Sequence, residues 1–417
     1  MKLGSIIKYY RLKNHLTQSE LAQDICSISH LSKIENNSYD GNAETVELLL
    51  NKLNVNLEKE EEKYEDIKEL LQDFYQSMVY YDIDEANRIC ETLINMEEFA
   101  SSTDLINQYH LYMYKYYILN RNIVKINQCQ RVIEKLQSSF SPFENVLASF
   151  LFGVALIGQN KVLEANDQFV ALMSYNQTEA ITFNGELYYQ IALCASILND
   201  AEKSIIQANK ALDIYQNENN LMRIIHTKML LGIGYSRLEM FEEASENYKT
   251  LIRLTKLLNK KDIYYHVLNN YSTMLNEKGE YKKAKELMIE CTKYFEKGST
   301  EYIVNKLGLI EILINMDANK EEINKLIDEV HEVCNNKIHK KYIMLAKMFK
   351  YKLFSQPKYY AYLENIVYSY HIDNYQFNEA RDVALKLAKR FQETGEVDKS
   401  LDYYNKYIEL SERSKKI

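Results

Sequence analysis

The chain has 417 residues, enough for two or three ordinary domains or one long repeat array, and its 46% apolar content excludes a disordered chain. Only 2 prolines and 11 glycines are present, so the composition favours long helices joined by short connections. The formal net charge of −8 excludes a protein that coats DNA with its whole surface, although a small basic segment can still bind DNA.

The stretch from residue 16 to residue 36 is predicted to form two short helices joined by a tight turn. Thr17 followed by Glu20 is a capping-box pattern at the start of the first of these helices. In the second helix Ile28, Leu31 and Ile34 recur every three residues, so we expect them to face the core.

The polar residues of the second helix define a candidate DNA-binding surface, because short polar and basic side chains suit contacts in the major groove. An ordinary helix pair with a solvated face is the less favoured alternative. Arg11 and Gln18 are expected to add phosphate contacts. Residues 1–33 carry a net charge of +3, and the acidic residues lie downstream. The candidate set is Arg11, Gln18, Ser27, Ser29, His30, Ser32 and Lys33.

Residues 3–57 resemble a Cro/repressor-type (XRE) helix-turn-helix domain, with the recognition helix at about residues 27–36 and closing helices at 41–57. Leu48, Leu49 and Leu53 are expected to return to its core. The turn Ile25-Cys26-Ser27 is one residue shorter than the common form and resembles the Gram-positive peptide-pheromone regulators of the PlcR and NprR type. The resemblance implies that residues 1–57 form a DNA-binding domain that binds an operator. It does not identify the operator.

The segment 58–66 is rich in acidic residues and is interpreted as a solvated linker or helix start. From residue 67 to residue 417 the pattern is helical and repeats. Leu231-Gly232-x-x-Tyr235 followed by Phe241-x-x-Ala244-x-x-x-Tyr248 matches the tetratricopeptide pattern. The period of 39 to 40 residues also suits a HEAT-like repeat, but the Leu-Gly-x-x-Tyr signature favours tetratricopeptide. The position of Ala244 in the second helix recurs at Ala165, Ser204, Ala284 and Ser400. Extrapolating the period places weaker units near Ala86, Ile126, Ile323 and Ala361, which gives about nine helix pairs.

The predicted fold class is therefore all-α, with a helix-turn-helix head followed by a right-handed superhelical solenoid whose first helices line a concave groove. An Asn side chain donates and accepts hydrogen bonds, so it can hold a peptide backbone whatever the peptide sequence. The alternative is that these Asn residues are ordinary surface residues in an Asn-rich chain. The candidate peptide-binding residues are Tyr189, His226, His266, Asn269, Asn270 and Asn305, and Glu186 shares the groove position of its helix.

The two-part layout resembles the quorum-sensing regulators grouped as Rap/Rgg/NprR/PlcR/PrgX, and is most similar to the NprR type. The resemblance implies a cytoplasmic receptor for a short signalling peptide that controls binding to a double-stranded DNA operator. It also implies a homodimer or higher homo-oligomer, and Asn side chains that hold the peptide. The alternative is a protein-interaction adaptor that binds a phosphorelay response regulator through the repeats, as NprR-type proteins are implicated in restraining sporulation.

Catalysis is not expected, because the sequence has no Gly-rich phosphate loop and its eight His residues form no catalytic pattern. The six cysteines are widely spaced, which predicts reduced core residues of a cytoplasmic protein and neither disulfides nor a metal site. No cofactor is expected. No apolar run approaches the ~20 residues of a membrane span, so no membrane association is expected.

Overall fold

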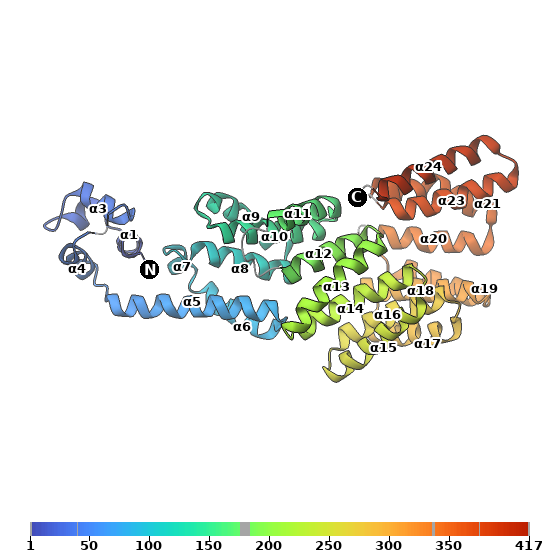
Figure 1. Cartoon of the computed structure of the whole chain (residues 1–417), viewed down its shortest axis with the longest axis horizontal. Helices are drawn as coiled ribbons and strands as arrows, with labels where there is room; N and C mark the ends of the chain where they lie inside the picture. Colours follow the sequence, from blue (N-terminus) through green and yellow to red (C-terminus); the bar gives the residue numbers. More distant parts are fainter. Residues whose placement is uncertain (1, 40, 176–183, 336–337, 375, 416–417) are drawn as a thin grey trace. The chain divides into compact units, whose positions relative to one another are not determined.

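A computed structural model describes residues 2–39, 41–175, 184–335, 338–374 and 376–415. In these ranges every regular element is a helix and no strand occurs, which confirms the all-α class (Figure 1). The chain divides into two compact units, residues 1–181 and residues 182–417.

The head of the first unit is a bundle of four short helices, of which the second, third and fourth begin with a side-chain cap. Thr17 and Glu20 form the predicted capping box, with Glu20 N–H donating to Thr17 Oγ1 at 3.2 Å and Thr17 N–H donating to Glu20 Oε2 at 2.7 Å. Ser27 caps the third helix by accepting from the His30 N–H at 3.2 Å. The helices are α1 (Leu3–Lys13), α2 (Gln18–Ala22), α3 (Ile28–Glu35) and α4 (Ala43–Lys52).

The core of the head differs from the expectation at two positions. Leu48 is 46% exposed, and Leu50 occupies the core with Leu49 and Leu53 instead. Ile28 is 51% exposed, whereas Leu31 and Ile34 are buried as expected. Both errors arise because a spacing of three or four residues does not show where the apolar arc of a helix ends.

Gly4 allows α1 to pack against the end of α3. A Cβ atom at this position would lie 1.8 Å from the carbonyl oxygen of Ile34, which is an impossible approach. The absence of a side chain at Gly4 therefore sets the distance between the two backbones.

The segment 58–66 is not a linker. It forms the first turns of α5 (Leu57–Val79), which Asn56 caps by accepting from the Lys59 N–H at 3.1 Å. Tyr10 of the head donates to Glu60 at 2.6 Å, so the head contacts the first helix of the array directly. The other elements of this unit are α6 (Ile83–Ile94), α7 (Glu97–Ser101), α8 (Ile106–Leu119), α9 (Ile123–Leu136), a 3-10 turn (Gln137–Ser139), α10 (Pro142–Gly158) and α11 (Val162–Tyr175).

The second unit continues the pattern of paired helices. In it, first helices also contact the first helices of neighbouring pairs, as α12 contacts α14, α14 contacts α16, and α16 contacts α18. This layering is the arrangement of a helical-repeat solenoid. The elements are α12 (Asn184–Ile197), α13 (Ala201–Asn217), α14 (Leu221–Arg237), α15 (Phe241–Leu257), α16 (Lys261–Glu277), α17 (Tyr281–Tyr294), α18 (Thr300–Asn315), α19 (Lys320–Val333), α20 (Lys340–Phe354), α21 (Gln356–Tyr362), a π-helical turn (Leu363–Val367), α22 (Tyr368–Asp373), α23 (Phe377–Thr394) and α24 (Val397–Lys415).

The long repeat period has a simple structural origin. Helices α13 to α16 each contain 17 residues. Three residues join one helix to the next, so a helix pair occupies 40 residues. A residue with positive φ ends each helix and turns the chain. These residues recur every 20 positions, at Asn199, Asn219, Glu239, Asn259 and Gly279.

The tetratricopeptide packing positions behave as predicted in the clearest unit. Ala244 is fully buried, and a Cβ atom on Gly232 would lie 2.9 Å from the ring of Tyr248. Ser204 and Ser400 approach the preceding first helix so closely that their hydroxyls donate to backbone carbonyls at 3.0 and 2.9 Å. Ala361 is exposed, contrary to the extrapolated register, because a π-helical turn directly follows α21.

Candidate nucleic-acid interface and peptide-binding surface

The recognition helix α3 presents a polar face to solvent. Ser27, Ser29 and Lys33 are exposed, and Ser32 and His30 are half-buried. The His30 ring lies edge-on to Tyr39, with 5.2 Å between ring centroids. Five of the seven predicted DNA-contacting residues are therefore exposed or half-buried.

The other two predicted contacts, Arg11 and Gln18, form hydrogen bonds within the head; Arg11 is buried and Gln18 is half-buried. Arg11 is 8% exposed and makes two hydrogen bonds to Glu35, from Nε at 2.6 Å and from Nη2 at 3.0 Å, and a third to the Leu16 carbonyl. Gln18 donates to the same carboxylate at 2.8 Å. Arg11 is thus not available to phosphate, and the prediction for this residue was wrong. The Gln18 amide is likewise already used to position Glu35.

Glu35 holds α3 against α1 and α2, and Lys52 joins α4 to α2; sequence reasoning assigned neither of them a role. Glu35 joins α1, α2 and α3 through Arg11 and Gln18. The Lys52 ammonium donates to the carbonyls of Glu20 and Gln23 at 2.8 and 2.9 Å, and so ties α4 to the end of α2. The terminal Ser-Lys-Ile-Glu pattern offered a signal for Glu35, but the sequence contained none for its partner 24 residues away.

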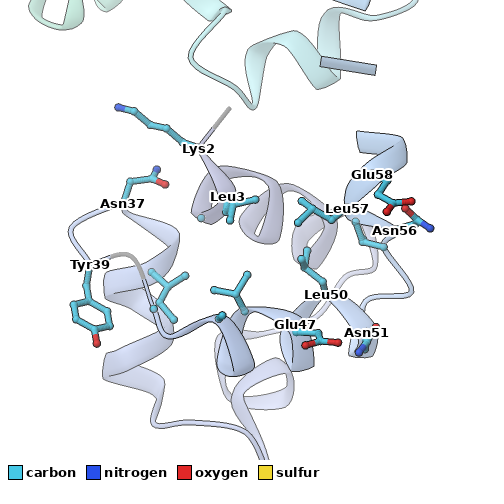
Figure 2. Close-up of a pocket in the computed structure, with 16 residues that line it drawn as sticks. Lys2, Leu3, Asn37, Tyr39, Glu47, Leu50, Asn51, Asn56, Leu57 and Glu58 are labelled. Carbon is cyan, nitrogen blue, oxygen red and sulfur yellow. The ribbon is translucent and has the colours of Figure 1, made fainter. Parts of the chain in front are cut away.

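A cavity of about 920 Å³ opens on the head (Figure 2). Its apolar lining includes Leu3, Leu50 and Leu57, with Lys2, Glu47 and Glu58 among its polar residues. None of its lining residues belongs to the polar face of α3. The cavity is therefore separate from the candidate DNA contacts.

The first helices of the second unit carry the candidate peptide-binding residues. On α12 the Glu186 carboxylate accepts a hydrogen bond from Arg223 Nε of α14 at 2.5 Å, and Tyr215 donates to it at 2.9 Å. The Arg223 guanidinium lies 4.5 Å from the centroid of the Tyr189 ring. Glu186 and Tyr189 are half-buried. Glu186 forms an ion pair with Arg223, and the Tyr189 ring lies beside the guanidinium, an arrangement that sequence reasoning did not find. Arg223 lies 37 residues after Glu186 in the sequence, which is about one repeat. This spacing was the signal from which the ion pair could have been predicted.

His226 lies one helical turn after Arg223 and is half-buried. Burial, followed by the charge of Arg223, lowers the pKa of the His226 imidazole to about 4. This side chain is therefore neutral near pH 7. It can donate or accept a hydrogen bond but offers no charge to a ligand.

Helix α16 places His266, Asn269 and Asn270 on its less buried face, as the register predicted. His266 is exposed, and Asn269 and Asn270 are half-buried. Within the described ranges neither of these two amide groups has a side-chain hydrogen bond. Both are therefore free to bind a ligand backbone.

Asn305 does not join this surface. It is 2% exposed, and its Nδ2 donates to the Glu301 carbonyl at 2.8 Å. The accessible face of α18 contains residues 304, 308 and 311 instead. Since successive helical residues point about 100° apart, a register error of one residue moves a side chain from the surface into the core.

Three further observations bear on the chemistry. In the described part of the chain, no group of three or more His, Cys, Asp and Glu side chains is arranged to hold a metal ion. All six cysteines are free thiols. Among the described helices, none combines the length and apolar character needed to cross a membrane.

Residues 7–59 match the helix-turn-helix family model, and residues 185–218 match the tetratricopeptide repeat model. The chain is 24% identical over 269 residues to the transcriptional activator NprA of Geobacillus stearothermophilus, a match that covers 63% of this chain and 65% of that protein, slightly less than two thirds of its length. It is 20% identical over 376 residues to the response regulator aspartate phosphatase I of Bacillus subtilis, covering 86% of this chain and 94% of that protein.

Among solved structures, NprR in complex with its cognate peptide NprX matches 83% of this chain and 99% of that chain, with 23% identity and a TM-score of 0.69. Fold and matches together define a helix-turn-helix protein that carries a tetratricopeptide-type array. Within that class, the chain is similar to NprA in sequence and to NprR in fold, in line with the resemblance to the Rap/Rgg/NprR/PlcR/PrgX regulators noted in its sequence.

Proposed function

We propose that this protein is a transcriptional regulator that binds a double-stranded DNA operator through α3 and is controlled by a short signalling peptide bound to the array. The observation that carries the proposal is the accessible face of α3, where Ser29 and Lys33 are exposed on a helix that Glu35 joins to α1 and α2. A rigid helix with short polar side chains can enter the major groove without rearranging.

The peptide component of the proposal rests on α16. Asn269 and Asn270 offer amide groups that no other described side chain engages, and exposed His266 lies beside them. Such amides can pair with the N–H and C=O groups of an extended peptide. NprR, which shares the fold, has been solved with a bound peptide. We infer that the head up to residue 57 binds DNA and that the array from α5 onward binds peptide and forms a homodimer.

The proposal is tested by DNA binding with a matched pair of variants. An operator selected from random duplexes should bind the purified protein, and Lys33→Ala should weaken binding and lower the slope of log K against log salt by about one, because one phosphate contact is lost. Lys325→Ala removes the same charge from the exposed surface of α19 and should leave binding unchanged. Equal effects of the two variants would contradict the assignment of α3.

A second candidate function is an adaptor that binds a phosphorelay response regulator through the repeats. The match to an aspartate phosphatase over 86% of this chain favours it. The purified protein is therefore titrated separately with a receiver domain and with candidate peptides. Calorimetry measures the affinity, and light scattering measures the mass of the complex. Receiver binding without peptide or DNA binding would support the adaptor, whereas saturable peptide binding that changes the mass would support the regulator.

A further inference from the structure

Ile28 is the first residue of α3, and 51% of it is exposed. It does not belong to the apolar core of the head, which α3 joins through Leu31 and Ile34. The exposed half of this β-branched aliphatic side chain gains no stability from burial in the head.

The position of Ile28 on the helix places it among the candidate DNA contacts. With about 100° between successive residues, Ile28, Ser32, Ser29 and Lys33 fall within an arc of about 140°. The buried residues Leu31, Ile34 and Glu35 occupy the remaining arc, and Ile28 lies at the edge of the accessible face next to Glu35. Ile28 is therefore an aliphatic side chain on an otherwise polar face.

We propose that Ile28 contacts the C5-methyl group of a thymine in the major groove and selects thymine at that position of the operator. This inference rests on the proposed DNA binding. Among the base edges in the major groove, only thymine presents an apolar group, whereas the others present donors and acceptors that an aliphatic side chain leaves unpaired. The branched side chain has one strongly preferred χ1 rotamer in a helix, so its methyl groups are held in place.

The surroundings of Ile28 favour a contact the size of one methyl group over a broad protein interface. Its neighbours on the face are Ser29, Ser32 and Lys33, which suit phosphates and polar base edges. Leu12 and Leu48, the other strongly exposed aliphatic residues of the head, lie on α1 and α4 and not on α3.

The test uses the full-length protein and begins with selection of an operator from random DNA duplexes. Each thymine of the selected half-site is then replaced by deoxyuridine, which removes only the methyl group. At one position the wild-type protein should lose about fourfold in affinity per half-site, the effect of one buried methyl group. Ile28→Ala should bind the thymine and deoxyuridine operators equally, and Ile28→Val should keep most of the discrimination.

Leu48→Ala is the matched control, because it truncates another exposed aliphatic side chain of the head and should keep the wild-type preference for thymine. Because Ile28 is half exposed and lies outside the core cluster of the head, its variants should fold like the wild type, which circular dichroism can verify. If no sequence is enriched, the proposed DNA binding itself fails. The thymine contact is overturned, while DNA binding stands, if an operator is found but no deoxyuridine substitution weakens binding. It is also overturned if deoxyuridine lowers the affinity of Ile28→Ala by the same factor as that of the wild type.

Discussion

At the scale of single residues, the head shows that charge alone does not identify a DNA contact. Arg11 is a basic residue near a recognition helix, yet its guanidinium makes all its described hydrogen bonds to Glu35 and Leu16. The exposed Lys33 and the apolar Ile28 are better placed on the accessible face. Burial therefore separates the structural cation from the candidate functional one.

Replacing Glu35 by Ala should destabilise the head by about 3–5 kcal/mol, because Arg11 would remain buried without its partner. Amide hydrogen exchange of α1–α4 measures this loss. Glu47→Ala removes an exposed carboxylate from α4 and should have little effect. Replacing both members of the pair, with Arg11→Met and Glu35→Leu, should recover much of the stability. A Glu35→Ala protein with wild-type protection would show that the pair does not hold the head together.

His226 should make the stability of the second unit depend on pH. Its pKa is about 4 in the folded chain and about 6.5 when unfolded, so the unfolded state binds more protons between these values. Stability should therefore fall as the pH decreases through this window, with a contribution of about 2 kcal/mol between pH 7 and pH 5. Urea unfolding of wild type and His226→Gln at both pH values isolates this contribution. An identical pH dependence in the two proteins would refute it.

At the scale of helices, the middle of the second unit is built from the 17-residue helices α13 to α16, which are joined by turns that contain a residue with positive φ. Asn and Gly suit this conformation, but Glu239 adopts it with φ 59° and has a β-carbon that opposes it. The equivalent position one repeat later is Gly279, with φ 88° and open space around it. The two positions differ in backbone strain but share the same turn.

Glu239→Gly should stabilise the second unit by roughly 1 kcal/mol, because it removes this strain. Gly279→Ala should destabilise the unit by a similar amount, because it introduces the strain at the matching turn. The midpoint of urea unfolding measures both changes. Shifts of the same sign in the two variants would mean that lost side-chain contacts, and not φ, decide the stability of these turns.

At the scale of the whole molecule, the proposed regulation requires that peptide and operator binding share one conformational equilibrium. The head contacts α5 through Tyr10 and Glu60, and the ring of Tyr9 meets Phe99 of α7 at 6.0 Å between centroids. A shift in the array can reach the head only if such contacts differ between the two states.

The coupling must be reciprocal. If the peptide changes operator affinity by a given factor, the operator must change peptide affinity by the same factor, and for typical couplings this factor is about 5 to 150. Titrating peptide with and without operator, and operator with and without peptide, checks the equality. Two binding events with no mutual effect would leave the protein as a receptor whose head is not controlled by the peptide.

Local chemistry explains what the sequence by itself determined. The capping box of Thr17 and Glu20, the helical fold class, the close packing of Gly232 on Tyr248 and the 40-residue period all follow from residues near one another in the chain. The register of α16 was also predictable, because its repeats are evenly spaced.

Only the tertiary structure decided which side chains are accessible. Arg11 meets Glu35 across 24 residues, Asn305 turns into the core, and Ile28 turns out of it. Each of these depends on the rotation of a helix about its own axis relative to its neighbours, where one residue changes the direction by about 100°. Periodicity identifies the helices, but the packing partners set that rotation, and with it the candidate sites.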